Sequence, residues 1–259
     1  MVEVVNSRST VTFHSVNFQL LLFLATMTPL VLFLLLAPTQ AWVPSLSPVR
    51  LTRLCQSIDQ GEVAAKIAST DRGRKVSTTQ REELETYFQD LEGQCTLAAP
   101  ARSPFVEGSW EVEYTDAPSP SNGQLGPFAG FAYQEVDLES GRYANVLKVP
   151  PNDWLSATLE ATWIEWDGVL IKDDREKSSE ETAAPAVVPD QDYGATSWVV
   201  TFESLTIKLF GIPVVSQKFN NVKRVWRTTY VDENTRIVRA GRTGEYKDEM
   251  FFYMTRNKE

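Results

Sequence analysis

The sequence predicts a mainly β fold, in which an antiparallel β-barrel follows a short N-terminal helical pair. Two patterns carry this prediction. Apolar residues recur at helical spacing up to Leu91, and from Trp110 onward they alternate with polar residues. Eight or nine short strands then follow with few helices between them, and closing such a sheet into a barrel removes its exposed edges.

The predicted helical region covers residues 54–96. Residues 51–69 carry apolar side chains at helical spacing, although Gly61 weakens the middle of that helix. Thr79-Gln-Arg-Glu82 has the pattern of a capping box, which would begin a second helix. The apolar stripe of that helix comprises Leu84, Tyr87, Phe88 and Leu91, and Gly93 is its expected end.

The barrel is expected over residues 105–256. Its strands should occupy residues 110–114, 131–138, 142–149, 158–166, 169–172, 197–209, 222–231, 236–240 and 249–255. Asp167-Gly168 is typical of a tight hairpin turn between two of them. Residues 173–193 are rich in Ala, Pro, Glu and Ser without periodicity and hold seven acidic side chains, so we expect a flexible acidic insert there.

The first 53 residues are expected to direct targeting. No Asp, Glu, Lys or Arg occurs between Ser9 and Val49, and residues 18–37 are almost wholly apolar, close to the ~20 residues that cross a bilayer. Thr39 and Ala41 fit a cleavage site, so we expect a signal peptide over residues 1–41 rather than a retained anchor. Residues 42–53 have the composition of a transit peptide, and together the two resemble a bipartite plastid presequence. A secreted protein with a short linker is the alternative.

Composition excludes several classes of function. The chain of 259 residues has one histidine, His14, inside the expected presequence, which excludes His-based catalytic triads and His-ligated metal sites. No glycine-rich phosphate loop of the usual spacing occurs, and we expect no cofactor. The net charge of −9 without a recognised nucleic-acid motif argues against binding of nucleic acid.

Several short motifs occur one after another along the chain from residue 108 to residue 239. They are Gly108-Ser-Trp110, Tyr114-Thr115, Val200-Thr-Phe202-Glu203, Leu209-Phe-Gly211-Ile-Pro213, Trp226, and Tyr230-Val-Asp232 with Arg236-Ile-Val-Arg239. In this order the motifs resemble the plastid lipid-associated protein, or PAP/fibrillin, family over about residues 54–256. The family usually continues Arg-Gly where this chain has Arg239-Ala-Gly241, so the final hairpin is expected to be longer.

The resemblance implies a lipocalin-like barrel in a plastid protein that is not an enzyme. It implies binding or organising of lipids such as fatty acids, carotenoids or prenylquinones, with peripheral contact to a thylakoid or plastoglobule surface. It also allows a protein partner, because some members are thought to support prenylquinone metabolism by contacting its enzymes.

The candidate ligand residues are those expected to face the barrel interior. They are Trp110, Tyr114, Phe131, Trp198, Phe202, Trp226 and Arg239, with Tyr133, Trp163 and Phe252 as further aromatic candidates. Aromatic residues more often fill a small barrel than line a cavity, so both arrangements stay open. Gly108-x-Trp110 also resembles the lipocalin signature, in which an arginine, here Arg239 or Arg256, packs on the tryptophan.

Arg239 shares a strand face with Ile237, because side chains alternate along a strand. If that face points inward, the guanidinium needs an acceptor, which a lipid carboxylate or head group would supply. The alternative is an ion pair with Asp232, Glu111 or Glu113.

The apolar segment 209–215 lies between two expected strands and is flanked by Lys208 and Lys218. The candidate membrane contacts are Leu209, Phe210, Ile212 and Val214. If exposed, this segment would insert at a lipid interface, with the lysines attracted to anionic head groups. If folded back, it would plug one end of the barrel.

Two rival functions stay open. One is a protein-interaction scaffold, in which the barrel is solid and the acidic insert recruits a partner. The other is an enzyme of apolar substrates that uses Glu165, Glu203 or Asp232 as acid or base, although no paired carboxylates are visible in the sequence.

Overall fold

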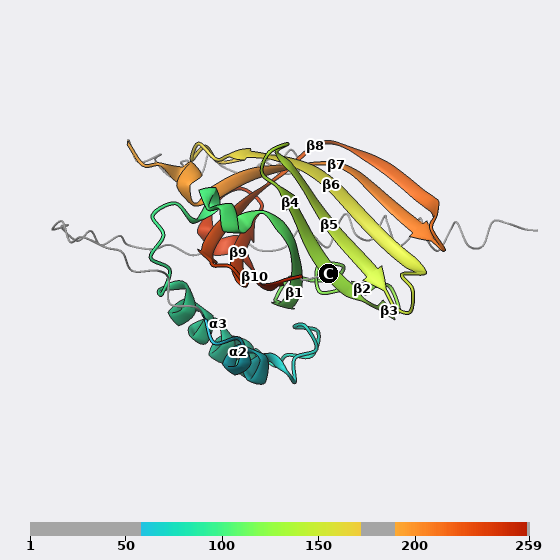
Figure 1. The fold of residues 1–259 in the computed structure, drawn as a ribbon, viewed down its shortest axis with the longest axis horizontal. Helices are drawn as coiled ribbons and strands as arrows, with labels where there is room; N and C mark the ends of the chain where they lie inside the picture. The colour runs from blue at the N-terminus through green and yellow to red at the C-terminus, as the bar shows by residue number, and fades with distance from the viewer. Residues whose placement is uncertain (1–57, 172–189, 258–259) are drawn as a thin grey trace, which may run out of the picture. The chain divides into compact units, whose positions relative to one another are not determined.

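The computed structural model describes residues 58–171 and 190–257 (Figure 1). The expected presequence, residues 1–53, and most of the expected acidic insert lie outside the described residues. The described chain has two α-helices followed by ten β-strands and four short 3₁₀ helices.

The two helices are α2 (Gln60–Ile67) and α3 (Thr78–Glu92). Asp59 caps α2 by accepting hydrogen bonds from the backbone N–H groups of Gly61 and Glu62, so the helix begins at Gln60 and Gly61 lies in its first turn instead of its middle. Ser77 caps α3 by accepting from the backbone N–H of Gln80, and the predicted cap at Thr79 is therefore wrong by two residues. The helix ends at Gly93, as predicted.

Eight of the ten described strands form a closed antiparallel barrel. The ten strands are β1 (Gly108–Thr115), β2 (Gln124–Leu125), β3 (Phe128–Ala129), β4 (Phe131–Asp137), β5 (Arg142–Val149), β6 (Leu155–Glu165), β7 (Ser197–Leu209), β8 (Ile212–Val231), β9 (Thr235–Gly241) and β10 (Met250–Arg256). Eight of them close in the order β1-β10-β9-β8-β7-β6-β5-β4, and β2 and β3 pair separately. The predicted lipocalin-like barrel with N-terminal helices is confirmed.

Two expectations about the strands are wrong. Residues 169–171 form no strand, because the Trp166 indole N–H donates to the Val169 carbonyl and Ile171 N–H donates to the Thr243 carbonyl, which holds the segment as a loop. Residues 209–215 are not a loop but the end of a long hairpin. Phe210 and Gly211 form its two-residue turn with φ of 51° and 80°, and β8 begins at Ile212 instead of residue 222.

Part of the barrel wall is buried on both its inner and its outer face. Its interior holds one apolar cluster that includes Trp110, Val136, Tyr143, Val200 and Met254. A second cluster lies on the outer face of β1, β8, β9 and β10, where α2 and α3 cover it (Figure 1). It includes Val63, Leu84, Phe88, Tyr230, Ile237, Phe251 and Tyr253. On these strands both faces are therefore buried.

Candidate ligand site in the barrel interior

Four of the seven predicted ligand residues face the barrel interior. Trp110, Trp198 and Trp226 are buried in the interior cluster, and Phe202 packs against it. Trp198 is opposite Trp226 on neighbouring strands, and its ring stacks on Trp163 with centroids 4.0 Å apart. The other three, Tyr114, Phe131 and Arg239, lie elsewhere.

Tyr114 is on the outer face because β1 contains a bulge. Val112 pairs with Met254 inside the barrel, but the next paired residue is Tyr114, opposite Tyr253, so Glu113 is the extra residue. An extra residue shifts the alternation by one and turns the following side chains to the other face. Tyr114 therefore stacks on Phe88 of α3 with centroids 5.3 Å apart, and its predicted interior position is wrong.

Phe131 also faces outward. On β4 it is Ala132 and Val136 that belong to the interior cluster, and Phe131 has the opposite parity. The Arg72 guanidinium lies over its ring at 4.3 Å from the centroid. The predicted interior position of Phe131 is wrong because alternation fixes which residues share a face, but not which face is inside.

Arg239 points to the helices instead of the barrel interior. Its guanidinium donates to both carboxylate oxygens of Glu92 at 2.8 Å and to Glu85 at 2.8 Å. Burial opposes its charge, but the bonds to Glu92 and Glu85 outweigh burial and raise the pKa of Arg239. The expected face with Ile237 is right, but its inward orientation is wrong.

The ion-pair partners expected for Arg239 have other roles. Asp232 accepts from the Tyr230 hydroxyl and from the backbone N–H groups of Asn234 and Thr235, each at 2.7 Å, which fixes the β8–β9 turn. Glu111 pairs with Arg72 at 3.1 Å, and Glu113 accepts from the Thr255 hydroxyl at 3.1 Å.

Trp110 and Arg256 close one end of the barrel. The Arg256 guanidinium lies 4.2 Å from the centroid of the Trp110 ring, so Arg256 is the arginine that makes the expected pair. The Trp110 indole N–H donates to the Val106 carbonyl at 2.9 Å. Arg256 donates to the carbonyls of Phe105, Glu107 and Glu233, which ties this end to the β8–β9 turn.

Arg236 is the charged residue that the sequence analysis missed. It has the opposite parity to Ile237 and Arg239 on β9 and is 0% exposed inside the barrel. Its guanidinium lies 5.6 Å from the centroid of the Trp198 ring, and its Nε and Nη1 atoms find no hydrogen-bond partner among the described residues. Burial lowers the pKa of Arg236 to about 10, so the side chain is a buried cation at neutral pH.

Three further side chains bring polar atoms to this interior without a hydrogen-bond partner in the described chain. They are the Gln134 amide, with both its atoms, and the indole N–H groups of Trp198 and Trp226. Tyr143 lies among them: its ring is 5.2 Å from Trp226, and its hydroxyl donates to Asn145, which pairs in register with Gln134. We call Gln134, Trp198, Trp226 and Arg236 the donor cluster.

The predicted membrane segment forms an exposed apolar tip. Leu209, Phe210, Ile212 and Val214 are 37%, 74%, 67% and 50% exposed, so the segment does not fold back into the barrel. Trp154 lies beside this tip, 6.0 Å from the Phe210 ring, and Phe128 contacts Trp154 at 5.0 Å. Figure 1 shows β2, β3 and the β7–β8 hairpin at the same end of the barrel.

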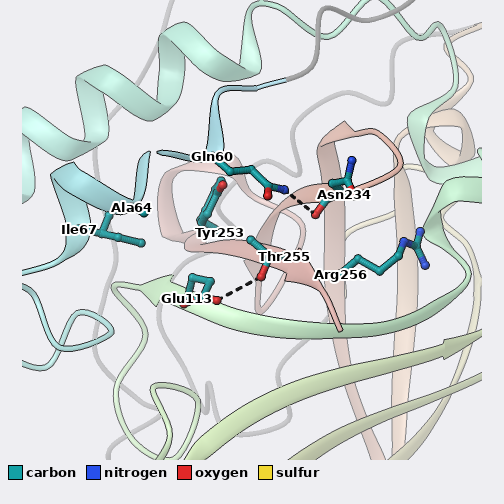
Figure 2. A pocket seen from close by; sticks show the side chains of 8 residues that line it. All are labelled: Gln60, Ala64, Ile67, Glu113, Asn234, Tyr253, Thr255 and Arg256. Atoms are coloured by element: carbon teal, nitrogen blue, oxygen red, sulfur yellow. Dashed lines mark hydrogen bonds between the residues drawn. The ribbon is translucent and has the colours of Figure 1, made fainter. Parts of the chain in front are cut away.

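A groove of about 270 Å³ lies outside the barrel between α2 and β10 (Figure 2). Its lining residues are Gln60, Ala64, Ile67, Glu113, Asn234, Tyr253, Thr255 and Arg256. Two hydrogen bonds cross it, from Gln60 to the Asn234 carbonyl at 3.2 Å and from Thr255 to Glu113 at 3.1 Å. The Gln60 contact therefore attaches α2 to the β8–β9 turn, and the Thr255 contact joins β10 to β1. None of the lining residues is a predicted ligand residue.

Two of the three carboxylates of the rival enzyme hypothesis, Glu165 and Asp232, are held in hydrogen bonds to other residues, and the third, Glu203, is exposed. Arg102 donates to both oxygens of Glu165 at 2.6 Å, and this contact lowers the pKa of Glu165. Glu203 is exposed on β7, and Asp232 is bound into its turn. Within residues 58–171 and 190–257, no group of three His, Cys, Asp or Glu is arranged to hold a metal ion.

No helix in the described part of the chain is long and apolar enough to span a membrane.

The PAP_fibrillin family model matches residues 60–246, which is more than half of the chain and covers both helices and the strands β1 to β9. The chain belongs to the PAP_fibrillin family. Searches of the curated proteins and of the solved structures give no significant match. Family membership supports the interpretation of this PAP_fibrillin protein as a plastid lipid-associated protein. Strand β10 lies beyond the matched residues.

Proposed function

We propose that this PAP_fibrillin protein is a non-enzymatic plastid protein that binds or organises lipids at a thylakoid or plastoglobule surface. The observation that carries the proposal is the exposed apolar tip of the β7–β8 hairpin. An aromatic side chain that is 74% exposed, beside an isoleucine that is 67% exposed, is costly in water and stable at a lipid interface.

The surroundings of the tip support a peripheral contact. Lys208 and Lys218 are exposed on the two strands of the hairpin, where anionic head groups would attract them. Trp154 and Phe128 widen the apolar surface beside Phe210, and tryptophan is favoured at the boundary between lipid and water.

The barrel interior supports a lipid ligand such as a fatty acid, a carotenoid or a prenylquinone. Apolar and aromatic side chains from all eight strands of the closed sheet meet there, including four predicted ligand residues, Trp110, Trp198, Phe202 and Trp226. We further propose that residues 1–53 deliver the protein to the plastid as a bipartite presequence.

Liposome flotation tests the surface contact. The chain from Trp42 onward, without the apolar run of residues 18–37, is mixed with vesicles of galactolipid and phosphatidylglycerol. We expect Phe210→Ser with Ile212→Ser to reduce the bound fraction at least tenfold, since both side chains leave water on binding.

Ile164→Ser is the matched control, because Ile164 is 66% exposed on β6, away from the tip. Its binding should equal that of the wild type, and all variants should keep the same thermal midpoint. Unchanged flotation of the tip variant would exclude the tip as the membrane contact.

A further inference from the structure

The donor cluster differs from the rest of the barrel interior in having unsatisfied hydrogen-bonding atoms. Six of its atoms have no partner among the described residues: Arg236 Nε and Nη1, Gln134 Nε2 and Oε1, and the Nε1 atoms of Trp198 and Trp226. They come from four strands, β4, β7, β8 and β9, and therefore from different sides of the barrel. Buried polar groups are nearly always hydrogen-bonded in folded proteins, so such a group of atoms requires an explanation.

The positive charge of the donor cluster and its excess of N–H donors indicate the kind of group that it binds. Five of the six atoms are N–H donors, and one of the four side chains is a cation. The buried carboxylate of Glu249, whose side chain is 5% exposed, pairs with Arg227, and no aspartate or glutamate of the described ranges forms an ion pair with Arg236. A buried guanidinium is stabilised when a carboxylate accepts from it in a fork-like geometry.

The surroundings of the cluster are apolar. Val200 and Val238 are 0% exposed and line the interior on the same strands as Trp198 and Arg236. Phe252 stacks on Trp226 with centroids 5.4 Å apart, and Met254 faces Arg236 from β10. An anion with an apolar body, that is an amphiphile, therefore matches these surroundings better than a free inorganic ion does.

We propose that the donor cluster is the head-group site for a long-chain carboxylate, with Arg236 pairing the carboxylate and the apolar interior of the barrel holding the tail. The inference rests on the proposed lipid-binding function and deepens it, because it names the class of ligand and the residue that selects it. A neutral isoprenoid would leave the Arg236 cation unpaired, so the site discriminates against a lipid without an acidic head.

The test compares an acid with its ester on the full chain. The probe is cis-parinaric acid, a fluorescent long-chain carboxylate, and the comparison is its methyl ester, which has the same tail and no charge. Energy transfer from the tryptophans, two of which belong to the donor cluster, reports binding. We expect the wild type to bind the acid at least tenfold more tightly than the ester.

Three variants assign the preference to Arg236. Arg236→Met should remove the preference for the acid while ester binding stays within about twofold, and Arg236→Lys should keep part of the preference because it keeps the cation. Arg142→Met, at an exposed arginine of β5, is the control and should bind both probes like the wild type.

The outcomes separate the inference from the function on which it rests. Equal binding of acid and ester to the wild type would overturn the inference and leave lipid binding intact. This comparison uses the wild type alone, so it does not depend on the folding of a variant. Binding of neither probe would overturn both. A preference that survives Arg236→Met would exclude Arg236 as the selecting residue.

Discussion

Two arginines of strand β9, Arg236 and Arg239, differ in whether their guanidinium groups have acidic partners. Arg239 faces the helices and is paired with two carboxylates, because Glu92 and Glu85 each lie 2.8 Å from its guanidinium nitrogens. Arg236 faces the barrel interior at 0% exposure, with two of its nitrogens unpaired within the described chain. The outer face of β9 therefore stabilises the fold by pairing its arginine with α3, whereas its inner face presents unpaired donors to the barrel interior.

The largest effect should follow from Arg239→Met. This change leaves Glu92, whose side chain is 14% exposed, without its cation beneath α3. Breaking a buried pair by removing one partner costs about 3 kcal/mol or more, and we expect a loss of roughly that size in the free energy of unfolding. Urea denaturation measures it, and a loss below about 1 kcal/mol would show that the pair is not structural.

Arg236→Met should change the free energy of unfolding in the opposite direction and stabilise the ligand-free protein. Replacing a buried unpaired cation by an apolar side chain of similar length removes its desolvation penalty, so the ligand-free variant should be more stable by about 2 kcal/mol. Denaturation of delipidated protein measures this. A destabilised variant would mean that Arg236 is held by internal interactions, as Arg239 is, and the contrast between the two would fail.

The stability of the wild type relative to Arg236→Met should rise at high pH. Burial disfavours the cation and lowers the pKa of Arg236 in the folded state to about 10, below its ordinary value. Between these values the unfolded state binds more protons than the folded state, so wild-type stability increases as pH rises through 10. By about pH 11 the gain should be about 1 kcal/mol, from ~1.4 kcal/mol per pKa unit.

Chemical denaturation of delipidated wild type and Arg236→Met at pH 8 and pH 11 isolates this gain, since the other titrating groups are common to both proteins. A stability difference that stays constant over this range would indicate a guanidinium that is already paired or solvated.

The smallest effect should come from Gln134→Leu. Both amide atoms of Gln134 lack a partner within the described ranges, so an apolar replacement of similar size should be neutral or stabilising by up to about 1 kcal/mol. Its thermal midpoint and its affinity for cis-parinaric acid are the measurements. A loss of more than about 1 kcal/mol would show that the Gln134 amide is satisfied inside the barrel.

The sequence predicts where strands lie better than which way they face. Alternation predicts β5 and β7 within their observed bounds, and Gly93 predicts the end of α3. The face of Tyr114 could not be predicted, because the bulge at Glu113 depends on pairing with β10, which is 142 residues away at Thr255. A local pattern carries no signal for such a long-range register shift.

The two arginines show a second limit. On β9 the inner face carries Val238 and the outer face carries Ile237, and both are 0% exposed. Each face has one valine or isoleucine and one arginine, so hydrophobic periodicity cannot distinguish them. Only the position of α3, whose Glu85 and Glu92 meet Arg239, decides that Arg236 is the interior residue.

Native mass spectrometry with lipid extraction decides whether the barrel holds an acid on Arg236, with wild type and Arg236→Met purified in parallel from a lipid-containing host. We expect one long-chain acid bound per wild-type chain and its loss from the variant. A wild type free of lipid even after incubation with excess oleate, or equal loading of both proteins, would contradict the assignment of the barrel interior as an Arg236-dependent lipid site.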